Sequence, residues 1–262
     1  MGTLTSDLCL ALDPVAFAHM LGFIFPDPWQ VDVLRCAGKR LLLNCARQSG
    51  KSTISAILAL HRAIYYPNSL VLLLSPSLRQ SAELLRKVSL MMEKLKGDLE
   101  LLEDNKLSCT IANGSRIISL PSSESTVRGF SGANLLIEDE ASRVPDDLYF
   151  AIRPMLAVSG GRLILMSTPF GKRGHFFQEW ENGGDNWERV EIPATMIPRI
   201  SAEFLEEERR SLGDWWFQQE YLCKFVESVD QIFDYDLVMN AITSDIKPLF
   251  TSDNYEGILL RT

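Results

Sequence analysis

Short apolar runs alternate with amphipathic stretches along the first two thirds of the chain. The run Leu41 to Cys45 stops at a small polar loop and is followed by Lys51 to Tyr66, where apolar residues recur at helical spacing. The pattern repeats in the run Ser69 to Leu74 and the amphipathic stretch Leu78 to Lys96. Two strand–helix units in succession favour a parallel sheet, because a crossover helix joins neighbouring parallel strands.

A β-hairpin is expected to interrupt this alternation. The segments Leu107 to Ile111 and Arg116 to Leu120 flank Asn113-Gly114. This dipeptide suits a type I′ turn, in which both central residues need a positive φ. The alternation then resumes with buried strands and a helix, so the fold class is α/β. The resumed elements are the strands Leu135 to Ile137 and Leu163 to Met166 and the helix Asp146 to Leu156.

The pattern changes after residue 185. One short strand, Trp187 to Ile192, precedes the acidic helix Ser201 to Leu212, where Ser201 is a suitable N-cap, and the helical stretch Trp215 to Tyr221. We interpret this part as a small lid subdomain. The chain is therefore expected to divide into a core (1–185), a lid (186–226) and a mixed segment (227–262).

The loop Cys45 to Ser52, the phosphate loop below, contains Gly-Lys-Ser between a strand and a helix, which is the context that predicts phosphate binding. Backbone N–H groups at the helix start hold an anion, Lys51 neutralises β- and γ-phosphate charge, and the Ser52 hydroxyl reaches Mg²⁺. Cys45 stands where such loops usually have glycine, and a structural turn with a surface lysine is the alternative. The other binding residues predicted here are Arg47, Gln48, Ser49, Gly50 and Thr53.

Three acidic residues end the strand that begins at Leu135. The carboxylates of Glu138, Asp139 and Glu140 repel one another unless a cation lies among them. We expect Asp139 in the Mg²⁺ shell and Glu140 polarising the attacking water. Strand alternation places Glu138 and Glu140 on one side and Asp139 on the other, unless the backbone turns out of the strand. The assignment of Glu138 stays open, and a solvated acidic loop is the alternative.

The next apolar strand ends at Ser167-Thr168-Pro169. Hydroxyl groups at this point lie where they can sense the γ-phosphate. A turn with proline as terminator explains the same residues.

Charge restricts how this chain can meet a nucleic acid. With 26 basic and 34 acidic residues the net charge is −8, which excludes global attraction to DNA and leaves only local basic patches. Paired basic residues are candidates, although such pairs are usually solvated. Five cysteines without a C-x-x-C pair and three separated histidines suggest neither a disulfide framework nor a zinc site. No signal peptide or membrane span is recognisable, so a soluble cytoplasmic protein is expected. The candidate pairs are Lys39-Arg40, Lys172-Arg173 and Arg209-Arg210.

Together these motifs resemble the ATPase domain of the large terminase subunit, the DNA-packaging motor of tailed bacteriophages and related viruses. The resemblance covers most of the chain. Three segments resemble the family's nucleotide motifs: Pro28-Trp29-Gln30 its adenine-side motif, Arg47 to Ser52 its phosphate loop, and Ile137 to Ala141 its acidic motif. Ser167 to Pro169 resembles the family's coupling motif. The stretch from Glu203 to Leu205 through Gln219 to Tyr221 resembles its lid.

The resemblance implies a P-loop NTPase sheet of the additional-strand, catalytic-glutamate type, with ATP and Mg²⁺ as cofactors. Trp29 and Gln30 would lie on the adenine side, and Ser167 and Thr168 beside the phosphates. A loop glutamine with Trp29 as a core anchor is the alternative for Gln30. Arg128 matches an arginine proposed to reach the ATP of a neighbouring subunit. For Arg128 and Arg47 the alternative is an ion pair with nearby acids. Catalysis would then depend on Glu140, Arg128, Lys51 and Arg47, and the metal on Ser52 and Asp139.

The resemblance also implies partners. They are double-stranded DNA, which is moved into a viral procapsid, a portal and a small terminase subunit. The chain would form a homo-oligomeric ring, pentameric in the family, that docks on the portal in the host cell cytoplasm. Family members usually continue into a nuclease domain. Residues 227–262 resemble the approach to one, so no nuclease activity is expected from this chain. The alternatives are a helicase-like or other P-loop NTPase and a nucleotide-operated assembly switch.

Overall fold

The computed structural model describes residues 4–95, 99–122, 127, 129–227, 237, 240 and 241. Residues 1–226 form one compact unit and residues 227–262 a second. All elements named below belong to the first unit. Among the described residues, no helix combines the length and apolar character needed to cross a membrane.

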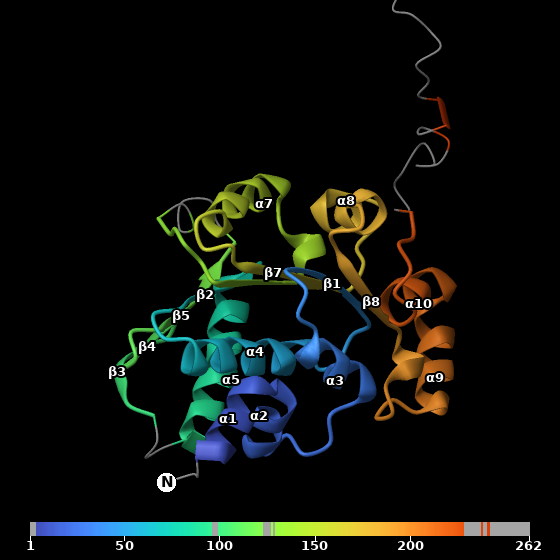
Figure 1. Cartoon of the computed structure of the whole chain (residues 1–262). Coiled ribbons are helices and arrows are strands. Elements are labelled where there is room, and N and C mark those ends of the chain that lie inside the picture. The colour runs from blue at the N-terminus through green and yellow to red at the C-terminus, as the bar shows by residue number, and fades with distance from the viewer. Residues whose placement is uncertain are drawn as a thin grey trace, which may run out of the picture. The chain divides into compact units, whose positions relative to one another are not determined.

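One sheet of eight strands organises this unit (Figure 1). Its strands are β1 (Arg40–Cys45), β2 (Leu70–Ser75), β3 (Leu101–Asp104), β4 (Ser108–Ile111), β5 (Arg116–Pro121), β6 (Leu135–Asp139), β7 (Arg162–Ser167) and β8 (Glu188–Ile192). They lie in the order β3-β4-β5-β2-β6-β7-β1-β8. In this spatial order, every neighbouring pair from β5 through β2, β6, β7 and β1 to β8 is parallel. The pairs β3–β4 and β4–β5 are antiparallel. β7 lies between β1 and β6, so the predicted additional-strand α/β sheet is confirmed.

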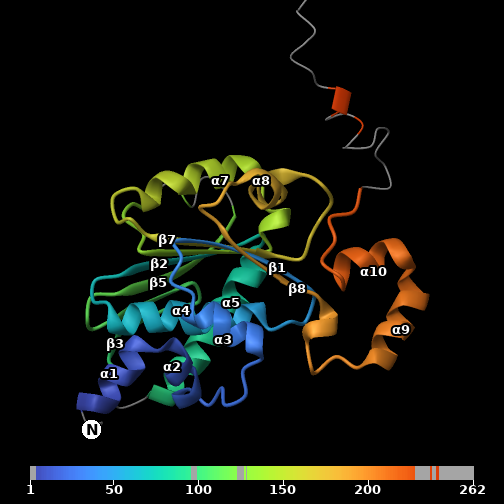
Figure 2. The same ribbon diagram turned by 45° about the vertical axis from the view of Figure 1, so that its right-hand side comes forward.

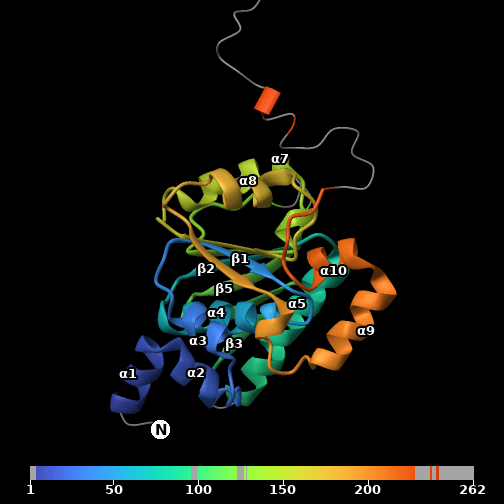
Figure 3. The ribbon, with the colours of Figure 1, turned by 90° about the vertical axis from the view of Figure 1, so that its right-hand side faces the viewer.

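Helices cover both faces of the sheet (Figure 3). Helices α2 to α5 lie on one face, and α7 and α8 on the other, whereas α9 and α10 lie beside the β8 edge (Figures 1 and 2). The helices are α1 (Leu4–Leu12), α2 (Pro14–Met20), α3 (Pro28–Arg35), α4 (Lys51–Tyr65), α5 (Leu78–Met92), α7 (Asp146–Ile152), α8 (Gly174–Asn182), α9 (Ala202–Leu212) and α10 (Asp214–Glu220). Short 3₁₀ turns span Glu93–Leu95, Ala141–Arg143, Arg153–Leu156 and Ala194–Met196.

Strand alternation divides the apolar core into two layers. Leu43 and Ile137 pack in the layer under α4 and α5, while Leu42 and Leu136 pack under α7 and α8. All four side chains are fully buried. Runs that are apolar on both faces are what a covered parallel sheet requires. This layering fixes the direction in which the residues at the strand ends point.

The hairpin differs from its prediction at the turn. β4 and β5 do pair antiparallel, and Gly114 has φ +83°, but Asn113 is not among the residues with positive φ, so the turn is not type I′. The Ile111 N–H donates to the Ser115 carbonyl, which makes a three-residue loop. A Cβ on Gly114 would lie 2.3 Å from Oδ1 of Asn68, so close packing also requires glycine there. β5 then extends the parallel sheet through β2.

The segment interpreted as a lid contributes to the main sheet. Its strand, β8, pairs in parallel with β1. The helices α9 and α10 follow, and the Ser201 hydroxyl accepts from the Phe204 N–H, as an N-cap does. A lid would therefore comprise these two helices without the strand, and the division of the chain into core and lid stays a prediction.

Candidate active site

The phosphate loop leaves β1 at the carboxyl end of the sheet and enters α4. Two residues with positive φ, Gln48 (59°) and Gly50 (99°), turn the backbone between them. A Cβ on Gly50 would lie 2.8 Å from Nε2 of Gln30, so a larger residue would strain the backbone and also displace that side chain. The turn places the amino end of α4, with its free N–H groups, at the sheet edge. This is the local geometry of an anion site.

A cavity of about 440 Å³, the nucleotide cavity below, opens over this loop. Four of its lining residues are basic and one is acidic, in a chain whose net charge is −8. Its positive character therefore comes from local placement, and it adds to the dipole of α4. The lining residues are Arg47, Gln48, Ser49, Gly50, Lys51, Ser52, Gln80, Lys87, Glu140, Arg143 and Thr168.

The Lys51 ammonium joins three of the predicted motifs. Its side chain is only 8% exposed. Nζ lies 3.2 Å from Oγ1 of Thr168 and 3.8 Å from Oε1 of Glu140. The phosphate loop, the end of β6 and the end of β7 therefore meet at one cation, although they are far apart in the sequence. A phosphate entering the cavity would meet the same cation.

Glu140 leaves the strand pattern through its own backbone. It has φ 55° and ψ 42°, the left-handed conformation, directly after β6 ends at Asp139. Continued alternation would send its side chain toward α8, but the turn brings it back to Lys51. Its N–H donates to Oδ1 of Asp139 (3.1 Å). Asp139 and Glu140 thus share a face, and Glu138 lies on the other.

Asp139 is a partly buried carboxyl close to another acid. Burial and the Glu140 charge raise the pKa of Asp139 to about 6, while Lys51 opposes the shift. A cation at this point would relieve the cost of ionising it. Among the described residues no three His, Cys, Asp or Glu side chains gather as a metal site. A metal here would therefore be held by Asp139, the Ser52 hydroxyl and oxygens from outside the protein, a donor set that fits Mg²⁺.

Glu138 forms a buried pair on the opposite face. Its Oε2 lies 3.0 Å from Nε2 of His175 in α8, and Nδ1 of the same ring lies 3.2 Å from Oδ1 of Asp146. The ring stacks on Tyr149 at 4.4 Å. Burial lowers the pKa of His175, but the hydrogen bonds and charges of Glu138 and Asp146 outweigh it, so the pKa is raised. This contact gives Glu138 a partner away from the cavity.

We expect this pair to stabilise the fold more at low pH than at high pH. Because the folded-state pKa of His175 lies above its unfolded value of about 6.5, the stabilisation is complete below that value and is lost as pH rises through the folded pKa. At pH 6, His175→Gln should lower the free energy of unfolding by about 3–5 kcal/mol, the cost of orphaning a buried charge. Urea unfolding at pH 6 and pH 9 measures the difference.

His61 supplies the control for this measurement, because burial lowers the pKa of its ring. The stability difference between the wild type and His61→Gln should therefore shrink as pH falls, the reverse of the His175 result. A His175→Gln difference that does not shrink between pH 6 and pH 9 contradicts the charged pair.

Two arginines of the cavity contact a glutamate of α10. Nε of Arg47 donates to Oε2 of Glu220, and Nη2 of Arg143 lies 3.9 Å from Oε1 of the same carboxylate. Glu220 belongs to α10 and its side chain is 8% exposed. Its neighbour Gln219 accepts the N–H of Gly171, just beyond β7 (3.2 Å). The ion pair considered for Arg47 is present, and it connects α10 to the phosphate loop.

Sequence reasoning missed three of the cavity residues: Gln80, Lys87 and Arg143. Gln80 and Lys87 come from the helix after β2, where nothing in the sequence distinguishes one exposed polar residue from the next. Arg143 follows Glu140 by three residues, and a basic residue so close to the acidic motif was a usable signal.

Gln30 contacts the phosphate loop, and Trp29 anchors the same helix, α3, in the core. Trp29 is buried in the core, and neither residue lines the nucleotide cavity. Gln30 accepts from the N–H of Asp27 (2.8 Å) and donates to the carbonyl of Ser49 (3.4 Å). Arg199 also donates to the Ser49 carbonyl (3.0 Å). An adenine contact by Trp29 or Gln30 stays a prediction.

Three further predicted residues, Thr53, Asp139 and Ser167, are described and do not line the cavity. Thr53 follows Ser52 in α4, and Asp139 precedes Glu140 at the end of β6. Oγ of Ser167 lies 2.6 Å from Oγ of Ser142, which ties the end of β7 to the turn after the acidic motif. Arg128 lies outside the described residues.

Comparisons with known proteins agree with this geometry. A family model, the N-terminal part of the terminase large subunit of T4likevirus type, matches residues 42–238. The terminase large subunit of Thermus virus P23-45 is 26% identical over 252 residues, covering 83% of this chain and 52% of that protein. The chain thus spans about half the length of this curated relative.

Two solved structures share the fold. The large terminase ATPase domain of Thermus phage P74-26 matches with a TM-score of 0.71 at 22% identity, covering 82% of this chain and all of that one. The large terminase of a thermophilic bacteriophage, solved in complex with ADP, matches with a TM-score of 0.63 at 13% identity, covering 77% of this chain and 54% of that one. With the family model matching well over half of its residues, the chain belongs to the terminase large subunit family.

Proposed function

We propose that this chain is the ATP-hydrolysing part of a motor that packages double-stranded DNA. The observation that carries the proposal is the Lys51 ammonium, which lies within reach of Thr168 and Glu140 at the amino end of α4. The terminase of the thermophilic bacteriophage, which shares the fold, has been solved with ADP bound, which supports a nucleotide in the cavity.

Five of the predicted residues receive a role in this proposal. Lys51 and the loop N–H groups hold the β- and γ-phosphates, and Glu140 accepts a proton from the attacking water. Ser52 and Asp139 hold Mg²⁺, which when bound supplies positive charge to the phosphates. Thr168, which already contacts Lys51, is placed to register the γ-phosphate. The side chains with these roles lie at or just after the carboxyl ends of β1, β6 and β7.

We also propose that nucleotide and lid compete for the same arginines. Arg47 and Arg143 contact Glu220 in this structure. A phosphate offers both guanidinium groups a more highly charged partner than one carboxylate. ATP would therefore loosen the contact between Glu220 and the phosphate loop, and α10 would move in step with the nucleotide.

The partners follow from the family and are proposals for this chain. They are double-stranded DNA, neighbouring copies in a ring, a portal and a small terminase subunit, in the host cell cytoplasm. Residues 227–262 would be a linker toward a nuclease domain, so this chain would not cut DNA itself.

The test is ATP turnover against protein concentration, with and without duplex DNA. We expect duplex DNA to stimulate turnover without strand separation. Unwinding of the duplex would favour a helicase, and tight ATP binding without turnover would favour an assembly switch. Lys51→Ala is the control: calorimetry should show ATP binding weakened by roughly 10–100-fold in a folded protein, because hydrogen bonds to a charged group are lost. Unchanged ATP affinity in that variant contradicts the assignment of Lys51.

A further inference from the structure

Two donors from distant parts of the chain meet on one carbonyl of the phosphate loop. The Ser49 carbonyl accepts from Nη2 of Arg199 (3.0 Å) and from Nε2 of Gln30 (3.4 Å). Arg199 belongs to the segment that leads into α9, 150 positions later in the sequence, and Gln30 belongs to α3. Neither of them lines the nucleotide cavity. Both donors therefore reach the loop from outside the cavity.

The direction of this carbonyl fixes the direction of the next N–H group. The peptide between Ser49 and Gly50 is trans, and in a planar trans peptide the C=O and the following N–H point in opposite directions. A Ser49 carbonyl that points out of the cavity thus turns the Gly50 N–H into it. Gly50 lines the cavity and immediately precedes α4, where a free N–H group can hold an anion.

Apolar neighbours place Arg199 beside the loop. Ile197 is buried in the core, and Ile200 packs against the same core cluster. The Ile200 N–H donates to the Ile197 carbonyl (3.0 Å), so the backbone turns between these two anchors and presents Arg199. A Cβ on Gly50 would lie 3.7 Å from Nη2 of Arg199. The guanidinium group therefore packs directly against the backbone that it orients.

A buried carboxylate holds the guanidinium group in this place. Nη1 of Arg199 lies 2.7 Å from Oδ2 of Asp27, whose side chain is only 7% exposed. The Asp27 N–H donates to Oε1 of Gln30 (2.8 Å), which leaves the Gln30 amide nitrogen for the Ser49 carbonyl. Arg199 thus serves two acceptors with two nitrogens, a fork that the single nitrogen of a lysine does not reproduce.

We propose that Arg199 is a positioning residue for nucleotide binding: it holds the Ser49 carbonyl out of the cavity and so keeps the Gly50 N–H directed at the phosphates. This role rests on the proposed function, because it requires a nucleotide in the cavity. It differs from the contact between Glu220 and Arg47, for which the nucleotide competes. Arg199 does not line the cavity, so it can stay in place when the nucleotide binds.

The first experiment measures ADP binding to the full chain by calorimetry. Arg199→Gln removes one donor and leaves Gln30 as the other, so ADP should bind about tenfold more weakly, the effect of losing one hydrogen bond from a charged group. Single-turnover ATP hydrolysis at saturating ATP should stay within a few-fold of normal, because Arg199 does not line the cavity. Arg199→Lys should recover only part of the affinity, because one nitrogen cannot serve both acceptors.

Stability has to be separated from positioning, because loss of Arg199 also leaves the buried Asp27 carboxylate without its ion pair. The double variant Asp27→Asn/Arg199→Gln removes both charges. Its thermal unfolding temperature should return toward the wild-type value while ADP affinity stays low. If ADP affinity returns together with stability, Arg199 acts only on the stability of the fold and the proposal is overturned.

A second readout needs no nucleotide. In ¹⁵N-labelled, nucleotide-free protein, the backbone amide signal of Gly50 reports the surroundings of its N–H group. This signal should shift both in Arg199→Gln and in the double variant with Asp27→Asn, because the Ser49 carbonyl loses the same donor in each. An unchanged Gly50 signal overturns the proposal.

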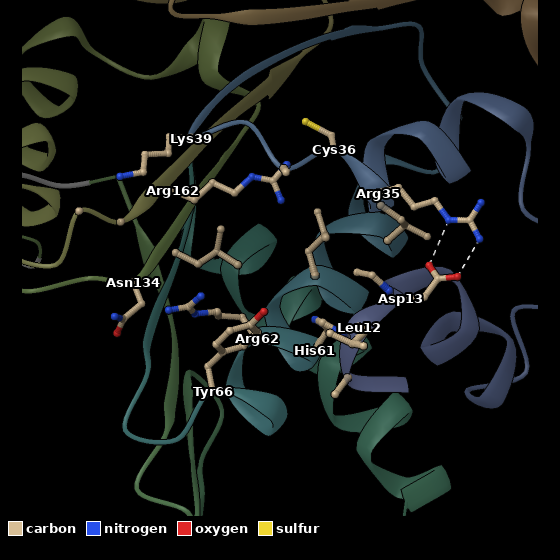
Figure 4. A pocket seen from close by; sticks show the side chains of 18 of the residues that line it. Leu12, Asp13, Arg35, Cys36, Lys39, His61, Arg62, Tyr66, Asn134 and Arg162 are labelled. Atoms are coloured by element: carbon tan, nitrogen blue, oxygen red, sulfur yellow. Dashed lines mark hydrogen bonds and ion pairs between the residues drawn. The ribbon is translucent and has the colours of Figure 1, made fainter. Parts of the chain in front are cut away.

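Arg35→Gln is the matched control. Arg35 also pairs with an aspartate, Asp13, through contacts of 3.1 and 2.7 Å, and it is similarly exposed (Figure 4). It lies in α3 and does not line the nucleotide cavity. Arg35→Gln should leave the Gly50 signal unchanged and ADP affinity within about twofold of the wild type, as expected for an exposed ion pair. An equal loss of affinity in Arg35→Gln and Arg199→Gln would show a general charge effect and overturn the proposal.

Two outcomes separate this proposal from the proposed function. If the wild type binds ADP and Arg199→Gln binds it equally well, the positioning role is overturned and the ATPase assignment stands. If the wild type binds neither ADP nor ATP, both proposals are overturned together.

Discussion

Glu140→Gln is expected to lower ATP turnover by roughly 10²–10⁴-fold while ATP still binds, the range that loss of a general base produces. The variant keeps the size of the side chain and removes its ability to accept a proton. Lys51 lies 3.8 Å from Oε1 of Glu140, so the glutamine also removes a competitor for the ammonium and should not weaken ATP binding. Single-turnover kinetics and calorimetry on the same preparation measure the two effects separately.

Glu138→Gln is the matched control, two residues earlier in the same strand. Its carboxylate is fully buried and contacts His175 on the opposite face, so turnover should stay within a few-fold of normal while stability falls. If Glu138→Gln instead gives the larger loss of turnover and Glu140→Gln is nearly normal, our register for the acidic motif is wrong.

The sheet was predictable because each of its central strands carries a complete signal. Residues 41–43, 70–74, 135–137 and 163–166 are apolar on both faces, and a helical pattern follows each of the first two strands. β3 carries no such signal, because all four of its residues are exposed. The predicted type I′ turn at Asn113-Gly114 was wrong for a different reason. The hydrogen bond that closes the hairpin joins Ile111 and Ser115, so the loop has three residues instead of two, and this changes the turn type.

The motifs that form the site could be predicted from the sequence, but the way in which their side chains are arranged could not. Periodicity could not place Glu140, because its left-handed backbone breaks the alternation on which the prediction rests. The contact between Arg47 and Glu220 joins residues 173 positions apart, and no local pattern reports such a distance.

Arg128→Ala is expected to lower ATP turnover by roughly 10³–10⁵-fold, the range for an arginine finger, while ATP binding stays normal. Two guanidinium groups line the described nucleotide cavity, Arg47 and Arg143, and both contact Glu220. Even where nucleotide draws these two arginines from Glu220, a further guanidinium from a neighbouring subunit would add charge opposite the γ-phosphate, where negative charge develops in the transition state. Specific activity of the wild type should then rise with protein concentration, and that of Arg128→Ala should stay low at every concentration.

Mixing two inactive variants decides whether Arg128 acts in trans. Arg128→Ala lacks the finger and keeps an intact cavity, whereas Glu140→Gln lacks the base and still carries Arg128. If the finger reaches a neighbouring subunit, the mixture should recover activity through interfaces that combine the two. Lys51→Ala mixed with Glu140→Gln is the control, because both changes damage the cavity of their own chain and no interface can repair either one. With assembly verified by light scattering, no recovery in the Arg128 mixture at any ratio would remove the neighbouring subunit from the mechanism, and equal recovery in both mixtures would show that complementation does not report on Arg128.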